Sequence, residues 1–262
     1  MRQFSADYLD TTRTGMWADS RSALSDLSLD ECERVLDVGC GTGELTRVLR
    51  EESDATVVGL DADATLLEAV PGPTVRGDAT RLPFDDDAFD LVVCQALLIN
   101  LPEPVAAVRE FGRVATDRVA AIEPDNGAVT VDSTVDSEPR LARRAREFFL
   151  DGVRTDVTLG ADAADAFERA GLDVVSTRRY DQQLTVEPPY DDSAVRAARR
   201  KATGEGLASD RETILDGGTT PAEYDALRER WREMGRTVVA QMQTDDYERT
   251  ETVPFFVTVG RV

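Results

Sequence analysis

The stretch that decides the fold is VLDVGCGTGELT, Val35–Thr46. An apolar, strand-like run leads into Asp37, glycines follow at Gly39, Gly41 and Gly43, and a helix-like segment comes next. Glycine is needed where the backbone takes a positive φ or lets a ligand approach closely. At the carboxyl end of a first parallel strand, such a turn predicts a small-molecule site in an open α/β sheet.

Strand-like and helix-like segments alternate from residue 30 onward, which predicts a parallel sheet built from βαβ units. The expected strands are Arg34–Val38, Thr56–Leu60, Thr74–Arg76, Phe89–Cys94, Arg118–Glu123, residues 172–180 and residues 253–262. The expected helices are Gly43–Arg50, Asp63–Ala69, Glu103–Val114 and a segment near residues 162–170 that ends at Gly171. Pro254 cannot donate to a strand ladder, so we expect it at the start of the last strand.

Two stretches exceed a minimal sheet, residues 127–159 and 187–251, and both contain helical patterns. In the second, Thr220 and Glu223 form a capping box with Pro221 at the first helical position. These helical inserts could cover the ligand site as a lid, or they could be extra core packing. The apolar pattern does not choose between the two.

The charge balance is strongly acidic, with 51 Asp and Glu against 30 Lys and Arg and a net charge of −21; Lys201 is the sole lysine. Such a field repels nucleic acid and anionic membranes, so we expect neither DNA nor a membrane as a partner. The composition resembles that of proteins from salt-accumulating halophiles, and we expect a halophilic archaeal origin. The arginine runs in the inserts could bind an anion, or they could be solvated helix faces.

The cysteines are Cys32, Cys40 and Cys94, and their spacing does not match a metal site. Because the chain contains no histidine, we expect no metal. A reduced, cytoplasmic protein is the simplest interpretation, and the N-terminus lacks the apolar core of a secretory signal.

The glycine turn does not match a dinucleotide fingerprint, since Glu44 stands where the third glycine is required. A carboxylate in the first helical turn would oppose a bound pyrophosphate. A phosphate loop is also excluded, because its lysine is missing. The surrounding acids suit a cationic ligand instead.

Four successive segments now make the chain resemble the class I S-adenosylmethionine-dependent methyltransferases, in the small-molecule, type 11-like branch: the glycine turn, VVGLD, GDATRLPF and FDLVVCQALLINLPEP. The resemblance implies that the turn holds the methionine part of S-adenosylmethionine, that Asp61 accepts from the ribose hydroxyls, and that Asp78 and Ala79 hold the adenine. Taken singly, Asp61 could be a helix cap and Asp78 a turn residue. The implied cofactor residues are Asp37, Gly39, Cys40, Gly41, Gly43, Asp61, Ala62, Asp78, Ala79 and Gln95.

The resemblance also implies a doubly wound, seven-stranded, mostly parallel sheet of order 3-2-1-4-5-7-6. Strand 7 is then antiparallel, and the helical inserts follow strands 5 and 6. We expect one domain over residues 1–262, with a Rossmann-like core at 30–182 and 252–262. Tyr8, Arg13 and Trp17 could touch the cofactor carboxylate or the substrate, or the two aromatics could simply pack a helix.

The chemistry excludes a histidine base, and the remaining candidates are Asn100, Glu123 and Asp125. These side chains could act as a base or orient the acceptor, or they could cap turns after the strands. The segment after Gln95 lacks the motif for methylating nucleic-acid amines, which favours a small-molecule methyl acceptor. The alternatives are a protein or RNA methyltransferase that docks through arginine-rich inserts, and a non-catalytic S-adenosylmethionine-binding module.

Overall fold

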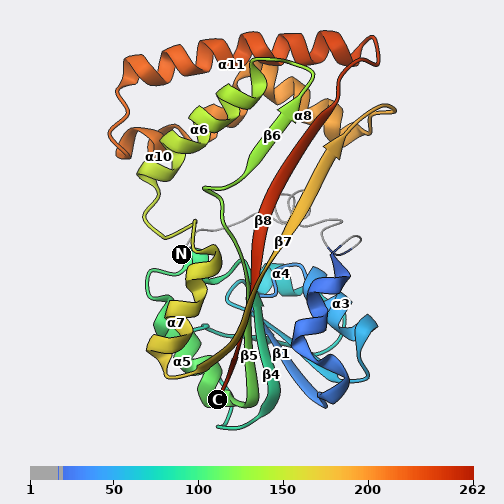
Figure 1. Cartoon of the computed structure of the whole chain (residues 1–262), viewed down its shortest axis with the longest axis vertical. Coiled ribbons are helices and arrows are strands. Elements are labelled where there is room, and N and C mark those ends of the chain that lie inside the picture. The colour runs from blue at the N-terminus through green and yellow to red at the C-terminus, as the bar shows by residue number, and fades with distance from the viewer. Residues whose placement is uncertain (1–16, 18–19) are drawn as a thin grey trace. The chain divides into compact units, whose positions relative to one another are not determined.

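The computed structural model describes Trp17 and residues 20–262 (Figure 1). The chain divides into two compact units. The first contains the residues up to Asp125, Thr158–Gln182 and Pro254–Val262, and the second contains Asn126–Val157 and Gln183–Val253. Among the described helices, none is both long enough and apolar enough to cross a membrane.

The first unit is built on a sheet whose parallel strands follow the order β3-β2-β1-β4-β5, with β8 antiparallel beside β5 and β7 paired to β8. This confirms the expected α/β fold and its strand order. Its strands are β1 (Arg34–Val38), β2 (Thr56–Asp61), β3 (Thr74–Arg76), β4 (Phe89–Gln95), β5 (Ala115–Pro124), β7 (Asp173–Val186) and β8 (Arg249–Arg261), the last two extending into the second unit.

Helices cover both faces of this sheet, because the strand residues alternate between two apolar clusters. Leu36 and Val38 of β1 belong to the cluster under α5 and α7, whereas Val35 belongs to the cluster under α3 and η1. The helices and 3₁₀ turns of this unit are η1 (Arg21–Leu27), η2 (Leu29–Glu31), α3 (Glu44–Glu52), α4 (Ala64–Leu67), η3 (Leu98–Asn100), α5 (Pro104–Val114), η4 (Gly160–Asp162) and α7 (Ala163–Ala170). As expected, α7 ends at Gly171, which has φ +95°.

The last strand differs from the expectation in two ways. Pro254 was expected at its start but lies in its interior, because β8 changes partner there. Residues Arg249–Thr252 pair antiparallel with β6 (Thr130–Ser133), and Phe255–Arg261 pair with β5. The missing N–H of Pro254 therefore falls between two ladders, and β6 is a strand that the helical pattern of the insert did not predict.

The second unit is mainly helical. The helix α11 keeps the expected capping box, with both the Thr220 and Glu223 side chains bonded to backbone N–H groups. It lies against α8, and a Cβ placed on Gly235 would come within 2.3 Å of backbone atoms of α8, so this crossing requires glycine. The helices are α6 (Glu138–Gly152), α8 (Asp192–Thr203), α9 (Glu205–Ser209), α10 (Arg211–Asp216) and α11 (Pro221–Met242).

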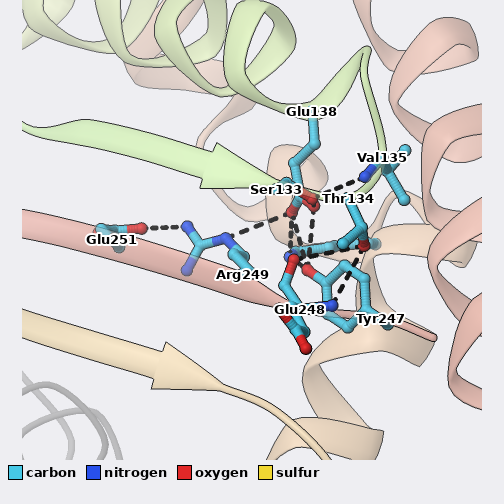
Figure 2. A network of polar contacts seen from close by, with 9 residues as sticks. Ser133, Thr134, Val135, Glu138, Tyr247, Glu248, Arg249 and Glu251 are labelled. Carbon is cyan, nitrogen blue, oxygen red and sulfur yellow. Dashed lines mark hydrogen bonds and ion pairs between the residues drawn. The ribbon is translucent and has the colours of Figure 1, made fainter. Parts of the chain in front are cut away.

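A buried polar network also organises the second unit (Figure 2). Glu138 is 1% exposed and accepts hydrogen bonds from Ser133 (2.7 Å), from the Tyr247 hydroxyl (3.0 Å) and from Lys201. Arg249 approaches the same carboxylate at 3.3 Å and pairs with Glu251. Burial alone would raise the pKa of Glu138, but the ammonium of Lys201 holds that pKa below its usual value. The only lysine of the sequence is thus a half-buried cation of this network.

Candidate functional site

The glycine turn lies at the carboxyl ends of neighbouring parallel strands. Gly39, Gly41 and Gly43 have φ values of +73°, +56° and +87°, which L side chains adopt only with strain. The Gly39 N–H donates to the Leu60 carbonyl at 2.7 Å, so the turn is fastened to the last residues of β2. Gly43 then starts α3, whose first amides point toward the same edge of the sheet.

The carboxylate of Asp61, at the end of β2, accepts a hydrogen bond from this turn. Its Oδ2 accepts the Gly41 N–H and its Oδ1 accepts the Asp63 N–H, both at 2.9 Å. A carboxylate offers about four acceptor positions, so each oxygen keeps capacity for a further donor. The half-buried side chain therefore fits a ligand with two adjacent hydroxyls, as a ribose has.

The other acidic residue of the turn has a structural partner. Asp37 is 1% exposed, and its Oδ2 accepts a hydrogen bond from Thr46 of α3 at 2.6 Å. This bond ties the end of β1 to the helix that follows the turn. Cys40 is buried beside Gly59, and burial raises the pKa of its thiol well above the usual value. The buried side chains of Asp37 and Cys40 therefore pack beneath the turn, on its protein side.

The predicted adenine segment lies one strand further along the edge. Asp78 is exposed, and its Oδ1 accepts both the N–H and the hydroxyl of Thr80 at 2.8 Å, which is the geometry of a turn residue. Ala79 is buried in the core under α5. Ala62 is exposed directly after Asp61, and its carbonyl accepts from Arg76.

Gln95 ends β4 on the same edge, since Cys94 is in register with Val38 of β1. Its Oε1 accepts the indole N–H of Trp17 at 3.3 Å. Trp17 is 1% exposed and packs edge-on against Phe255, so the structure gives it a packing role. Tyr8 and Arg13 lie outside the described residues.

The three catalytic candidates lie in different environments. Asn100 is buried, and its amide donates to the Ala96 carbonyl at 2.8 Å. Glu123 is fully buried and accepts the backbone N–H groups of the segment after β4. Asp125 follows the end of β5 and is half-buried, and its N–H donates to the Pro254 carbonyl. Of the three, Asp125 has the most exposed side chain.

Three residues that shape the turn were not singled out in the sequence. The Leu97 side chain would lie 2.8 Å from a Cβ on Gly39, and Val70 would lie 2.8 Å from a Cβ on Gly43. Thr46 is 0% exposed on the inner face of α3. A polar residue among apolar residues on the inner face of a helix is a signal that could have identified Thr46. Leu97 and Val70 carry no such signal, because their sequence pattern is that of ordinary core residues.

The comparisons with known proteins agree with this geometry. Residues 36–121 match the family model described as "Methyltransferase domain". The chain is 36% identical over 104 residues to the demethylmenaquinone methyltransferase of Staphylococcus epidermidis, which is 36% of this chain and 43% of that protein. The chain therefore spans less than half the length of the curated relatives it matches.

Two solved structures match nearly the whole chain and show its fold. One is a Bacillus halodurans protein named as a methyltransferase, with TM-score 0.54 and 15% identity over 93% of this chain and 98% of that one. The other comes from a complex of the Haloferax volcanii Trm112 methyltransferase activator with a protein named as a methyltransferase, with TM-score 0.53 and 18% identity over 97% and 91%. Residues 36–121 therefore resemble a methyltransferase domain, a type of domain for which S-adenosylmethionine is the methyl donor.

Proposed function

We propose that this chain is an S-adenosylmethionine-dependent methyltransferase that transfers a methyl group to a small-molecule acceptor. The observation that carries the proposal is the pairing of Gly41 with Asp61. It combines a glycine turn at the end of β1 with a carboxylate at the end of β2. The match of residues 36–121 to a methyltransferase domain supports the same conclusion.

The proposed cofactor contacts follow from the arrangement of the strand ends. The backbone of the glycine turn would face the methionine part. The turn needs glycine at Gly39 and Gly43, because a Cβ at these positions would collide with Leu97 and Val70. Asp61 would accept the ribose hydroxyls, and Asp78 with Ala79 would border the adenine. Asp37, Cys40, Ala62 and Gln95 would form the surrounding wall.

Bound S-adenosylmethionine supplies an electrophilic methyl group on a sulfonium. The chain's own residues would hold the acceptor in line with that methyl group and keep water out, which are the main contributions that a protein makes to such a displacement. Where the acceptor must lose a proton, a carboxylate would take it, since the chain has no histidine. Asp125 is our candidate because its side chain is not fully buried.

The acceptor is proposed only as a class. The net charge of −21 opposes binding to nucleic acid, which favours a small molecule. The curated relatives are named for demethylmenaquinone, but their similarity covers only 36% of this chain. The helical inserts lie outside the family match, and we propose that they select the acceptor, in a protein that works in a reducing, cytoplasmic setting.

The test pairs a cofactor-binding measurement with a methyl-transfer assay. Calorimetric titration should detect binding of S-adenosylmethionine and no binding of NAD. Asp61→Ala should lower the affinity for S-adenosylmethionine by about 100-fold, because the substitution removes two hydrogen bonds to a charged group. Asp63→Ala is the matched control, since Asp63 only caps α4 through the Thr65 N–H. Equal affinities in the two variants would refute the ribose assignment.

Labelled methyl transfer then identifies the acceptor class. Label that appears in a metabolite fraction supports the proposal. Label in RNA or protein would instead identify a macromolecular methyltransferase that docks through its arginine-rich inserts. Cofactor binding with no turnover on any fraction would identify a non-catalytic binding module.

A further inference from the structure

Glu123 is a buried carboxylate with an unusual set of partners. It lies at the end of β5 with 0% exposure, beside β4 on one side and β8 on the other. Its Oε1 accepts the Leu97 N–H at 3.1 Å and the Leu98 N–H at 2.9 Å, and its Oε2 accepts the Ile99 N–H at 3.3 Å. Three successive amides surrounding one carboxylate form an anion-binding nest.

The segment after β4 needs this carboxylate because its backbone turns sharply. Ala96 has a φ of +48°, and the 3₁₀ turn η3 begins with no side-chain cap of its own. Glu123 supplies the missing cap from another strand. Leaving these buried N–H groups without acceptors would cost about 1–3 kcal/mol each.

The same segment touches the glycine turn. The Leu97 side chain lies against Gly39, where an added Cβ would meet Leu97 Cδ1 at 2.8 Å. The Leu97 N–H is one of the three groups that Glu123 holds. A continuous set of contacts therefore runs from Glu123 through Leu97 to the turn.

We infer that Glu123 is a positioning residue that fixes the Ala96–Asn100 segment and sets Leu97 against Gly39, so that the cofactor turn keeps its shape. This inference rests on the proposed function for its effect on the cofactor. It assigns Glu123 a role different from that of a base, because a fully buried carboxylate bonded to three amides is not presented to an acceptor.

The protonation of Glu123 gives the role a measurable signature. Burial raises the pKa of Glu123 to about 7, although the three amides act in the opposite direction. The titratable group that faces it from β4 is Cys94, whose pKa is raised by burial and by Glu123, and Asp37 of β1 acts on that thiol. Opening the segment would expose Glu123 to water and return its pKa to the usual value, so opening should become easier as the pH rises through about 7.

The experiment compares Glu123→Gln with Asp90→Asn in the full chain. Asp90 is a matched control because its Oδ2 also accepts two successive backbone N–H groups, those of Glu33 and Arg34, at 2.8 Å. It lies at the amino end of β4, away from the glycine turn. Hydrogen exchange of the Leu97, Leu98 and Ile99 amides in the cofactor-free protein reports the segment directly.

In the Glu123→Gln variant we expect these amides to lose protection and S-adenosylmethionine to bind about tenfold more weakly. Wild-type affinity should fall as the pH rises through about 7, whereas the variant should show a flat profile. Asp90→Asn should keep both the affinity and its pH dependence. Loss of turnover with unchanged affinity and protection would identify Glu123 as a base and overturn the inference.

A second variant covers the case in which Glu123→Gln does not fold. Leu97→Ala leaves the carboxylate in place and removes the contact with Gly39. This variant should lower the affinity for the cofactor while the Leu98 and Ile99 amides keep their protection from exchange. Unchanged affinity would overturn the inference. If wild-type protein binds no S-adenosylmethionine, the proposed function fails, and amide protection alone then decides the role of Glu123.

Discussion

Replacing Gly43 with alanine should lower both the stability of the fold and the affinity for the cofactor. The structure separates two causes, backbone strain at a positive φ and a steric collision with Val70. Gly43 has φ +87°, and a Cβ there would lie 2.8 Å from Val70 Cγ1 and 3.0 Å from Cγ2. Gly171, at the end of α7, has nearly the same backbone conformation, with φ +95°, but nothing lies within 4 Å of an added Cβ. Gly171→Ala is therefore a control for backbone strain alone.

The expected magnitudes follow from these geometries. A left-handed backbone costs a non-glycine residue about 1–2 kcal/mol, and this cost applies to both variants. Overpacking a buried site costs about 1–3 kcal/mol more, and it applies only to Gly43, because Val70 is 7% exposed and has little room to move. We expect Gly43→Ala to lose about 2–5 kcal/mol of unfolding free energy and Gly171→Ala about 1–2 kcal/mol.

Urea unfolding measures these losses, and calorimetric titration measures the affinity for S-adenosylmethionine. Gly43→Ala should lower the affinity for S-adenosylmethionine more than tenfold, while Gly171→Ala should leave this affinity unchanged. In a Val70→Ala background the cost of Gly43→Ala should shrink, because the colliding methyl groups are gone. Equal losses in the two single variants, or the same cost in both backgrounds, would refute the steric argument.

Three further predictions concern charge. Lys201→Met leaves Glu138 buried without its main cation and should cost about 3 kcal/mol, whereas Arg154→Met, in an exposed pair, should cost under about 1 kcal/mol in the same urea titration. Because the folded-state pKa of Glu123 is raised from 4.5 to about 7, its stabilising contribution is complete below pH 4.5 and is lost as the pH rises through 7. Wild type should therefore lose about 3 kcal/mol relative to Glu123→Gln over that range, and parallel slopes would contradict this. With a net charge of −21, the protein should unfold at low salt and refold in molar KCl, as followed by circular dichroism; salt-independent spectra would exclude halophilic adaptation.

The parts of the fold that local signals specify were predictable. The bounds of β1 and β3 agree with the expectation, because apolar runs between turn residues mark both strands. The capping box of α11 and the glycine at the end of α7 were also read correctly, since each depends on residues that are close in sequence. The position of the glycine turn at the carboxyl edge follows from the same alternation of strands and helices.

The sequence by itself therefore determined the alternation of strands and helices in the first unit, the glycine turn and the class of ligand. Only the tertiary structure decided what surrounds that turn. Glu123 meets the Leu97 N–H across 26 positions of sequence, and β6 exists because Arg249–Thr252 lie beside it. Contacts of this kind leave no periodic pattern in either segment, because each residue taken alone satisfies only local rules. Packing the strands side by side is what brings a buried glutamate to the backbone N–H groups of Leu97, Leu98 and Ile99.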